Sequence, residues 1–203
     1  MSALATVILA AGQSSRMGRP KLLLPWAGTT VLGQLVQIWS RVPATQVAIL
    51  HAQGDMGIAA ELDRLGFPAE NRIINPNPER GMFSSIQCAS QWQGWKASLT
   101  HWAVSLGDQP QLKLETLFAL ADFASQHPGK ICQPRYEGHA RHPVVLPKAA
   151  FAALADSRAK TLKKFLELRQ SESAFVEMDD RGLDLDIDYV ADYEAALKMM
   201  KES

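Results

Sequence analysis

The feature that most constrains the fold is a regular alternation of short apolar runs with amphipathic segments along the first 125 residues. The apolar runs predict strands at residues 6–9, 46–50, 72–74 and 101–106. Apolar residues recur at helical spacing over residues 30–42, 58–65, 82–92 and 114–125. Strands that alternate with helices form parallel sheets covered on both faces. The sequence therefore predicts an α/β fold with a doubly wound, mostly parallel central sheet.

The second half of the chain has a less regular pattern. Strands are predicted at residues 130–134, 142–146 and 174–178, and helices at residues 149–155, 160–169 and 191–200. The polar stretch RYEGHAR at residues 135–141 fits either a β-hairpin or a functional loop between paired strands. Because the chain has 203 residues, we expect a single domain.

The charge balance argues against some classes of partner. Lysine plus arginine and aspartate plus glutamate number 21 each, so nothing in the composition favours nucleic acid or an anionic membrane. No apolar run approaches the ~20 residues that cross a bilayer, and no N-terminal targeting segment is recognisable. Cys88 and Cys132 lie far apart without the spacing of a zinc site, and are expected to be free thiols. We therefore expect a cytoplasmic protein.

A polar, basic loop separates two apolar segments near the start of the chain. It reads LAAGQSSRMGRPK at residues 9–21 and precedes LLLPW. Glycine backbones let amides point inward, hydroxyls add donors, and basic side chains add charge. The groups concerned are Gly12, Gly18, Ser14, Ser15, Arg16 and Lys21. The loop is therefore expected to hold a polyanion beyond the carboxyl ends of the strands, where ligands bind in such sheets.

The glycine spacing of this loop excludes two common nucleotide motifs. Five residues separate Gly12 from Gly18, and Lys21 lies three residues further on with no serine or threonine after it. That is not the P-loop of ATPases, and the G-x-G-x-x-G pattern of dinucleotide-binding folds is also missing.

Five segments, taken in order, resemble one family. They are LAAGQSSRMGRPKLLLPWAG at residues 9–28, RGMFSSIQ at 80–87, GDQP at 107–110, RHPVVLP at 141–147 and DIDYVADYEAAL at 186–197. Together they are similar to nucleotidyltransferases of Rossmann-like fold, most closely to the branch that attaches CMP or GMP to molybdopterin. The resemblance covers nearly the whole chain. It implies a three-layer α/β fold, with a nucleotide-binding half at residues 1–112 and an acceptor-binding half at 113–203.

The resemblance also implies an activity, which is transfer of a nucleotidyl group from a nucleoside triphosphate to the phosphate of molybdopterin. Mg2+ or Mn2+ would assist, and pyrophosphate would leave. The Ala-Ala-Gly form of the loop is similar to the cytidylyltransferases, whereas guanylyl-transferring relatives tend to carry glycine in place of Ala11, so CTP is the expected donor. Two alternatives stay open: a sugar-phosphate or methylerythritol-phosphate acceptor, or a non-catalytic nucleotide- or cofactor-binding chaperone. A molybdoenzyme or its chaperone is a candidate partner.

Residue roles follow from the matching segments. Lys21, Asp108 and Arg16 are expected to be catalytic. The expected nucleotide-binding residues are Leu9, Ala10, Ala11, Gly12, Ser14, Ser15, Arg16, Lys21, Asn75, Gly81 and Ser84. Ser84 fits equally well a role in satisfying the backbone at the start of a helix.

The candidate metal ligands are Asp108, Asp186 and Asp188. Asp108 follows a buried strand with Pro110 fixing the turn, although a turn former would look the same. Asp186 and Asp188 would share one face of an extended strand, and their alternative role is to cap the last helix. Asp179, Asp180 and Asp184 fit solvated charge better.

The acceptor is expected to contact Arg141 and His142, in a segment where relatives usually read Gly-His-Pro. A structural role for a lone histidine beside a strand is about as common. Lys160, Lys163 and Lys164 could meet a phosphate, but a solvated helix face explains them better.

Overall fold

The centre of the protein is an eight-stranded sheet. The computed structural model describes residues 3–12, 14 and 16–202. The strand order is β10-β7-β9-β6-β1-β4-β5, with β8 paired to β7. The bounds are β1 (Leu4–Ala10), β4 (Ala44–Ala52), β5 (Arg72–Asn75), β6 (His101–Leu106), β7 (Ile131–Tyr136), β8 (His139–Ala140), β9 (Val144–Pro147) and β10 (Ser173–Glu177). A separate two-stranded sheet joins β2 (Pro25–Trp26) to β3 (Thr29–Thr30).

Most neighbouring strands run in the same direction. β1 lies parallel to both β4 and β6, β5 is parallel to β4, and β10 is parallel to β7. Within the described residues of this central sheet, antiparallel pairs come only from β9, which lies between β6 and β7 and runs against both, and from the short β8, which pairs with β7. The predicted α/β fold with a mostly parallel central sheet is confirmed.

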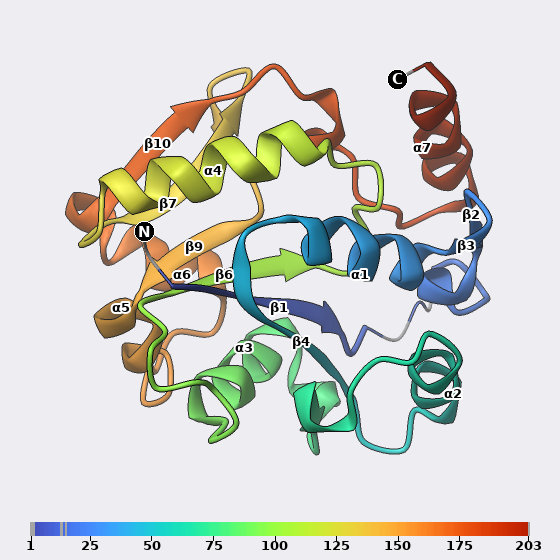
Figure 1. Ribbon diagram of the computed structural model, residues 1–203, viewed down its shortest axis with the longest axis horizontal. Coiled ribbons are helices and arrows are strands. Elements are labelled where there is room, and N and C mark those ends of the chain that lie inside the picture. Colours follow the sequence, from blue (N-terminus) through green and yellow to red (C-terminus); the bar gives the residue numbers. More distant parts are fainter. Residues whose placement is uncertain (1–2, 13, 15, 203) are drawn as a thin grey trace.

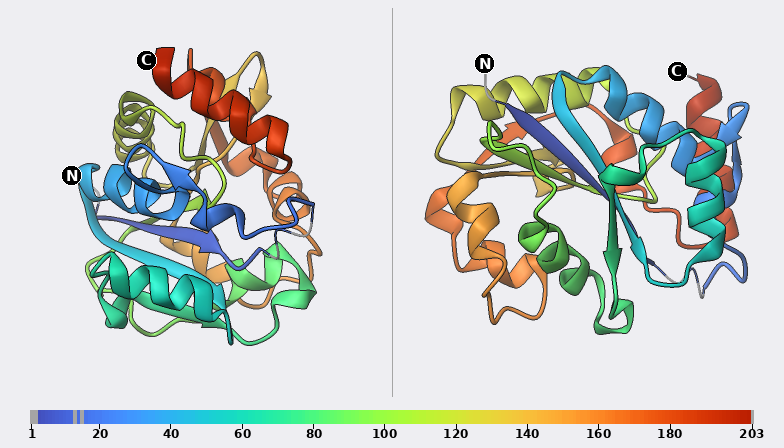
Figure 2. Two further views of the ribbon diagram at one scale, coloured as in Figure 1. Left: turned by 90° about the vertical axis from the view of Figure 1, so that its right-hand side faces the viewer. Right: turned by 60° about the horizontal axis from the view of Figure 1, so that its bottom comes forward.

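Helices cover both faces of this sheet and make it the middle of three layers (Figure 1). Their bounds are α1 (Val31–Arg41), α2 (Met56–Arg64), α3 (Met82–Gln91), α4 (Leu114–Gln126), α5 (Lys148–Ala153), α6 (Leu162–Glu167) and α7 (Val190–Glu202). α1 and α4 lie on one face, while α3, α5 and α6 lie together on the other (Figures 1 and 2). None of the helices in the described ranges is long and apolar enough to cross a membrane.

Each face has its own core. On the α1 side, the buried Trp39 indole nitrogen donates to Ser105 Oγ at 3.0 Å and fixes α1 on β6. On the α3 side, the rings of Trp102 and Phe151 stack at 4.6 Å and fix α5 on β6. Because both cores rest on β6, the carboxyl end of that strand is held from both sides.

The stretch RYEGHAR forms a tight hairpin rather than an extended loop. Arg135 pairs with Ala140 and Tyr136 with His139 across the turn. Glu137 and Gly138 occupy the turn with φ values of 49° and 77°, the left-handed geometry of a two-residue hairpin.

Two further expectations need correction. The predicted helix at residues 160–169 begins only at Leu162, because Thr161 caps it by accepting the Lys164 amide at 3.1 Å. Asp180, expected to be solvated, is buried. Its carboxylate accepts from Thr116 Oγ1 at 2.7 Å and from the Gly182 amide at 2.9 Å.

Candidate active site

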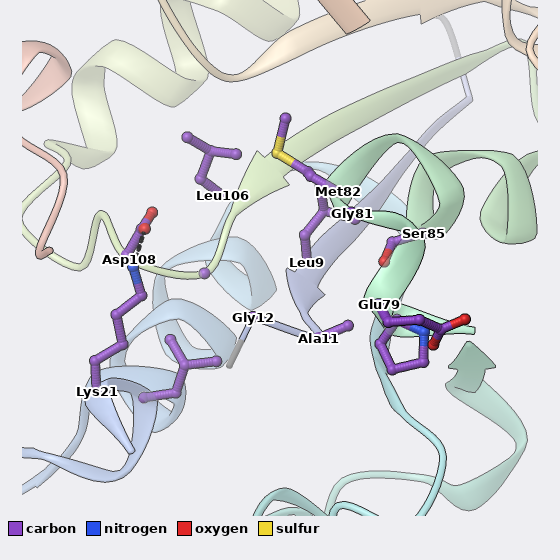
Figure 3. A pocket seen from close by; sticks show the side chains of 13 residues that line it. Leu9, Ala11, Gly12, Lys21, Glu79, Gly81, Met82, Ser85, Leu106 and Asp108 are labelled. Atoms are coloured by element: carbon purple, nitrogen blue, oxygen red, sulfur yellow. Dashed lines mark hydrogen bonds and ion pairs between the residues drawn. The ribbon is translucent and has the colours of Figure 1, made fainter. Parts of the chain in front are cut away.

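A cavity of about 430 Å³ opens at the carboxyl ends of β1 and β6. Figure 3 shows Lys21 and Asp108 on one side, Glu79 and Ser85 on the other, and the end of β1 between them. The lining residues are Leu9, Ala11, Gly12, Lys21, Leu22, Pro78, Glu79, Gly81, Met82, Ser85, Leu106, Gly107 and Asp108. This is the crevice in which parallel α/β sheets bind ligands.

Lys21 links two carboxylates at the wall of this cavity. Its Nζ lies 2.5 Å from Asp108 Oδ2 and 3.1 Å from Asp188 Oδ1, and Arg16 Nη1 lies 2.6 Å from Asp188 Oδ2. Burial alone would lower the pKa of Lys21, but Asp108 and Asp188 outweigh it and raise that pKa. Burial likewise opposes ionisation of Asp188, whereas Lys21 and Arg16 lower its pKa overall. The four groups form a charge-balanced cluster.

The loop before Lys21 is bent by its own hydrogen bonds. Ser14 has a φ of 48°, its carbonyl accepts from the Met17 amide at 3.1 Å, and its Oγ accepts from the Lys21 amide at 3.1 Å. Gly18 supplies a second left-handed position with a φ of 66°. These contacts aim the Lys21 side chain at Asp108.

The segment that carries Asp186 and Asp188 is a loop and not the predicted strand. It is held because the Ile187 amide donates to the Asp108 carbonyl at 3.1 Å. Gln109 Nε2 also donates to Asp186 Oδ1 at 2.9 Å. Desolvation, followed by the charges of Asp108 and Asp188, raises the pKa of Asp186 to about 6. Asp186 and Asp188 thus lie beside Asp108 at the end of β6, although their segment does not pair with a strand.

These carboxylates fit a divalent cation in part. Asp108 Oδ1 is buried and has no hydrogen-bond partner in the described part of the chain, and carboxylate oxygens are the ligands Mg2+ and Mn2+ prefer. However, the described residues contain no converging group of three metal-binding side chains. Among the described residues, Lys21 lies between Asp108 and Asp188, and the metal-ligand set of Asp108, Asp186 and Asp188 stays a prediction.

The last helix holds this arrangement from outside. Asp192 Oδ2 accepts from the amides of Asp188 at 3.0 Å and Tyr189 at 2.7 Å. The next residue, Tyr193, donates its hydroxyl to the Pro25 carbonyl. α7 accordingly lies beside the β2–β3 hairpin (Figure 1), which follows the Lys21 loop.

Comparison with known proteins agrees with this geometry. The family described as the MobA-like NTP transferase domain matches residues 6–174. The chain belongs to this family. Its α/β fold is therefore that of a nucleotidyltransferase.

Two curated relatives of this MobA-like chain are molybdenum cofactor enzymes. The molybdenum cofactor guanylyltransferase of Mesorhizobium japonicum is 32% identical over 69% of this chain, and the match spans 64% of that enzyme. The molybdenum cofactor cytidylyltransferase of Escherichia coli (strain K12) is 27% identical over 100% of both chains.

Solved structures share the fold. Rv0371c of Mycobacterium tuberculosis H37Rv is 27% identical with a TM-score of 0.74, over 97% of this chain and 98% of that one. A structure of Rv0371c in complex with manganese has a TM-score of 0.68 at 24% identity, over 97% of this chain and 99% of that one.

The MobA-like site contains some of the expected nucleotide-binding residues and not others. Leu9, Ala11, Gly12, Lys21 and Gly81 line the cavity, whereas Ser15 lies outside the described residues. Ala10 does not line the cavity. Successive side chains of β1 point to opposite faces of the sheet, and that of Ala10 is buried on the other face.

Asn75 and Ser84 support the site rather than line the cavity. The buried Asn75 amide donates to Ser84 Oγ at 3.1 Å and Ser85 Oγ at 3.0 Å, and its oxygen accepts from the Asn77 amide. Ser84 Oγ donates to the Gly81 carbonyl at 2.8 Å. Ser85, which sequence reasoning left out, lines the cavity.

The expected acceptor residues, Arg141 and His142, both contact other parts of the protein. Arg141 forms an ion pair with Asp184. His142 Nδ1 lies 3.5 Å from the Val104 carbonyl, and desolvation lowers the pKa of its ring. Neither residue lines the cavity.

Proposed function

We propose that this nucleotidyltransferase is metal-dependent, moves CMP from CTP to the phosphate of a molybdopterin-type acceptor, and releases pyrophosphate. The observation that carries the proposal is the cluster of Lys21, Asp108, Asp188 and Arg16 at the wall of the cavity. Residues 1–112 would bind the nucleotide and residues 113–203 the acceptor.

The chain's own residues would act by positioning and by neutralising charge. Lys21 and Arg16 would leave their carboxylates and hold the triphosphate, while Gly12 and the loop amides orient it. An oxygen of the acceptor phosphate would bond to the α-phosphorus as the bond to the pyrophosphate oxygen breaks. No protein nucleophile is needed.

Asp108, together with Asp186 or Asp188, would hold Mg2+ or Mn2+ once Lys21 has moved to the triphosphate. When bound, the cation supplies positive charge against the α-phosphate as negative charge develops there. The buried, unpartnered Asp108 Oδ1 and the manganese complex of Rv0371c support this assignment.

The choice of CTP rests on Ala11, which lines the cavity, and on the full-length similarity to a cytidylyltransferase. Thermal unfolding with CTP, GTP, ATP or UTP, each with and without Mg2+, tests it. CTP at 100 times its Kd would stabilise the fold by about 2.7 kcal/mol, or roughly 5–10 °C for a chain of this size.

The test has three outcomes. A magnesium-dependent shift that is largest with CTP, followed by pyrophosphate release when molybdopterin is added, supports the proposal. A larger shift with GTP overturns the cytidylyl assignment. Nucleotide binding without pyrophosphate release favours the non-catalytic chaperone.

A further inference from the structure

A second cleft, of about 420 Å³, lies between the first turn of α3 and the loop that precedes α6. Three basic side chains line it: Arg80 before α3, and Arg158 and Lys160 in the loop. No acidic residue is among its lining residues in the described part of the chain. In a protein with equal numbers of acidic and basic residues, this concentration of positive charge is local.

These three cations have no ion-pair partner among the described residues. The ion pairs found there engage other cations, such as Lys21, Arg16 and Arg141, and none engages the side chains of Arg80, Arg158 or Lys160. Unpaired like charges that face one cleft repel one another, and a bound anion removes that repulsion.

The loop that carries two of the cations is fastened to α3. Gln87 Nε2 donates to the carbonyls of Leu154 at 3.2 Å and Ser157 at 3.1 Å, and Gln91 Nε2 donates to the Ala155 carbonyl at 3.3 Å. Beneath the cleft, the ring of Phe83 packs against Phe165 of α6 at 6.5 Å. The cleft is preorganised, which lowers the entropy lost on binding.

The cleft and the nucleotide cavity share the first turn of α3. Met82 and Ser85 face the cavity, whereas Ser84 and Gln87 face the cleft. Gly81 lines the cavity, and Arg80 beside it lines the cleft. Met82, which lines the cavity in this shared turn, is 46% exposed.

We propose that this cleft binds an oxyanion group of the acceptor, with Arg80, Arg158 and Lys160 as its cationic contacts. The inference rests on the proposed function, since it assumes that an anionic acceptor approaches the nucleotide cavity. The cleft also offers cations without an ion-pair partner to that acceptor. Arg141 does not, because it is paired with Asp184.

The test compares R158S/K160S with K163S. Lys163 is exposed on α6 and lines neither the cavity nor the cleft, so K163S is a control for losing one positive charge outside the cleft. Binding of molybdopterin without nucleotide is measured by ultrafiltration and by its fluorescence. We expect R158S/K160S to weaken this binding by roughly tenfold or more, K163S to leave it unchanged, and R158K/K160R to retain it.

Steady-state kinetics gives the second measurement. In R158S/K160S the KM for the acceptor should rise while the KM for the nucleotide and the melting temperature stay as in the wild type. Unchanged acceptor binding in R158S/K160S, an equal loss in K163S, or no binding by the wild type overturns the inference. Failure of the proposed function looks different: molybdopterin binding depends on the cleft, but no pyrophosphate is released.

Discussion

The two basic regions of this protein differ in how their charges are satisfied. Beside the cavity at the carboxyl ends of β1 and β6, Lys21 and Arg16 are paired with Asp108 and Asp188. In the cleft beside α3, Arg80, Arg158 and Lys160 face one another without a carboxylate among the described lining residues. In the balanced cluster, Lys21 and Arg16 can bind an anion only if another cation replaces them beside the two carboxylates. In the unbalanced cleft, a bound anion directly reduces the repulsion among the three cations. The first region therefore suits a triphosphate that carries a metal ion, and the second suits an oxyanion without one.

The largest expected effect comes from breaking the balanced cluster at Asp108. In Asp108→Asn the carboxamide is neutral and cannot replace the carboxylate, whether toward Lys21 or toward a cation. We expect turnover at saturating Mg2+ to fall at least about 100-fold, measured as pyrophosphate release. Asp179→Asn removes an exposed carboxylate outside the cavity and should keep full activity. Wild-type turnover in Asp108→Asn would contradict the assignment.

A carboxylate satisfied by neutral donors extends the comparison. Asp180 accepts from Thr116 Oγ1, the Gly182 amide and, at 3.2 Å, the Lys113 amide. Asp180→Ala leaves those buried donors without partners, so we expect the free energy of unfolding to fall by about 2 kcal/mol. Urea denaturation of this variant and of Asp179→Ala, which should stay within about 0.5 kcal/mol of wild type, provides the measurement. Equal stability of the two variants would show that the buried contacts of Asp180 contribute nothing.

Removing Lys21 from the balanced cluster should leave it with an excess of negative charge, the opposite of the cleft. Lys21→Met leaves Asp108 and Asp188 without the ammonium group that lies between them. We expect nucleotide-free Lys21→Met to bind Mn2+ about tenfold more tightly than wild type, as measured by electron paramagnetic resonance of free Mn2+. Weaker binding would mean that these carboxylates do not hold the metal.

The smallest effect concerns Asp186, whose pKa is raised from 3.8 to about 6. Between these pH values the folded protein binds more protons than the unfolded chain, so stability falls as the pH rises through that window. Asp186→Asn should match wild type near pH 4. At pH 7 in EDTA it should be more stable by less than about 1 kcal/mol. The carboxyl is partly desolvated, but the residue as a whole is exposed, so water screens its charge and reduces the effect. Urea midpoints at both pH values test this, and a gain at pH 4 alone would reverse the sign.

The sequence predicted where the strands end, and therefore much of the site. Lys21 and Asp108 follow neighbouring parallel strands, so strand order alone brings them to one edge. The sequence pattern around Asp186 and Asp188 correctly predicted that they lie near Asp108, but it wrongly predicted a strand. Alternation of polar and apolar residues also occurs in loops that are held by hydrogen bonds to other segments, as this one is.

Other residues could not be assigned from local sequence. Asn75 comes at the end of a predicted strand and Ser84 comes soon after a glycine, which are positions typical of ligand-binding residues. Only the tertiary structure shows that their polar groups form hydrogen bonds within the protein. A start of α6 two residues later than predicted places Lys160 in the loop and not on the helix. Burial of Asp180 depends on Thr116, which is 64 residues away.

The contact of Tyr193 with the Pro25 carbonyl has a consequence for exchanging parts between related enzymes. The loop proposed to hold the nucleotide and the helix that steadies it are far apart in the sequence, since Tyr193 lies 168 residues after Pro25. A chimera that replaces residues 9–30 with those of a relative would keep a C-terminal helix shaped for the old loop. We therefore expect the choice of nucleotide donor in this fold to depend on two separate segments, the loop and α7. A chimera that exchanges only the loop would lack a matching helix to pack against it.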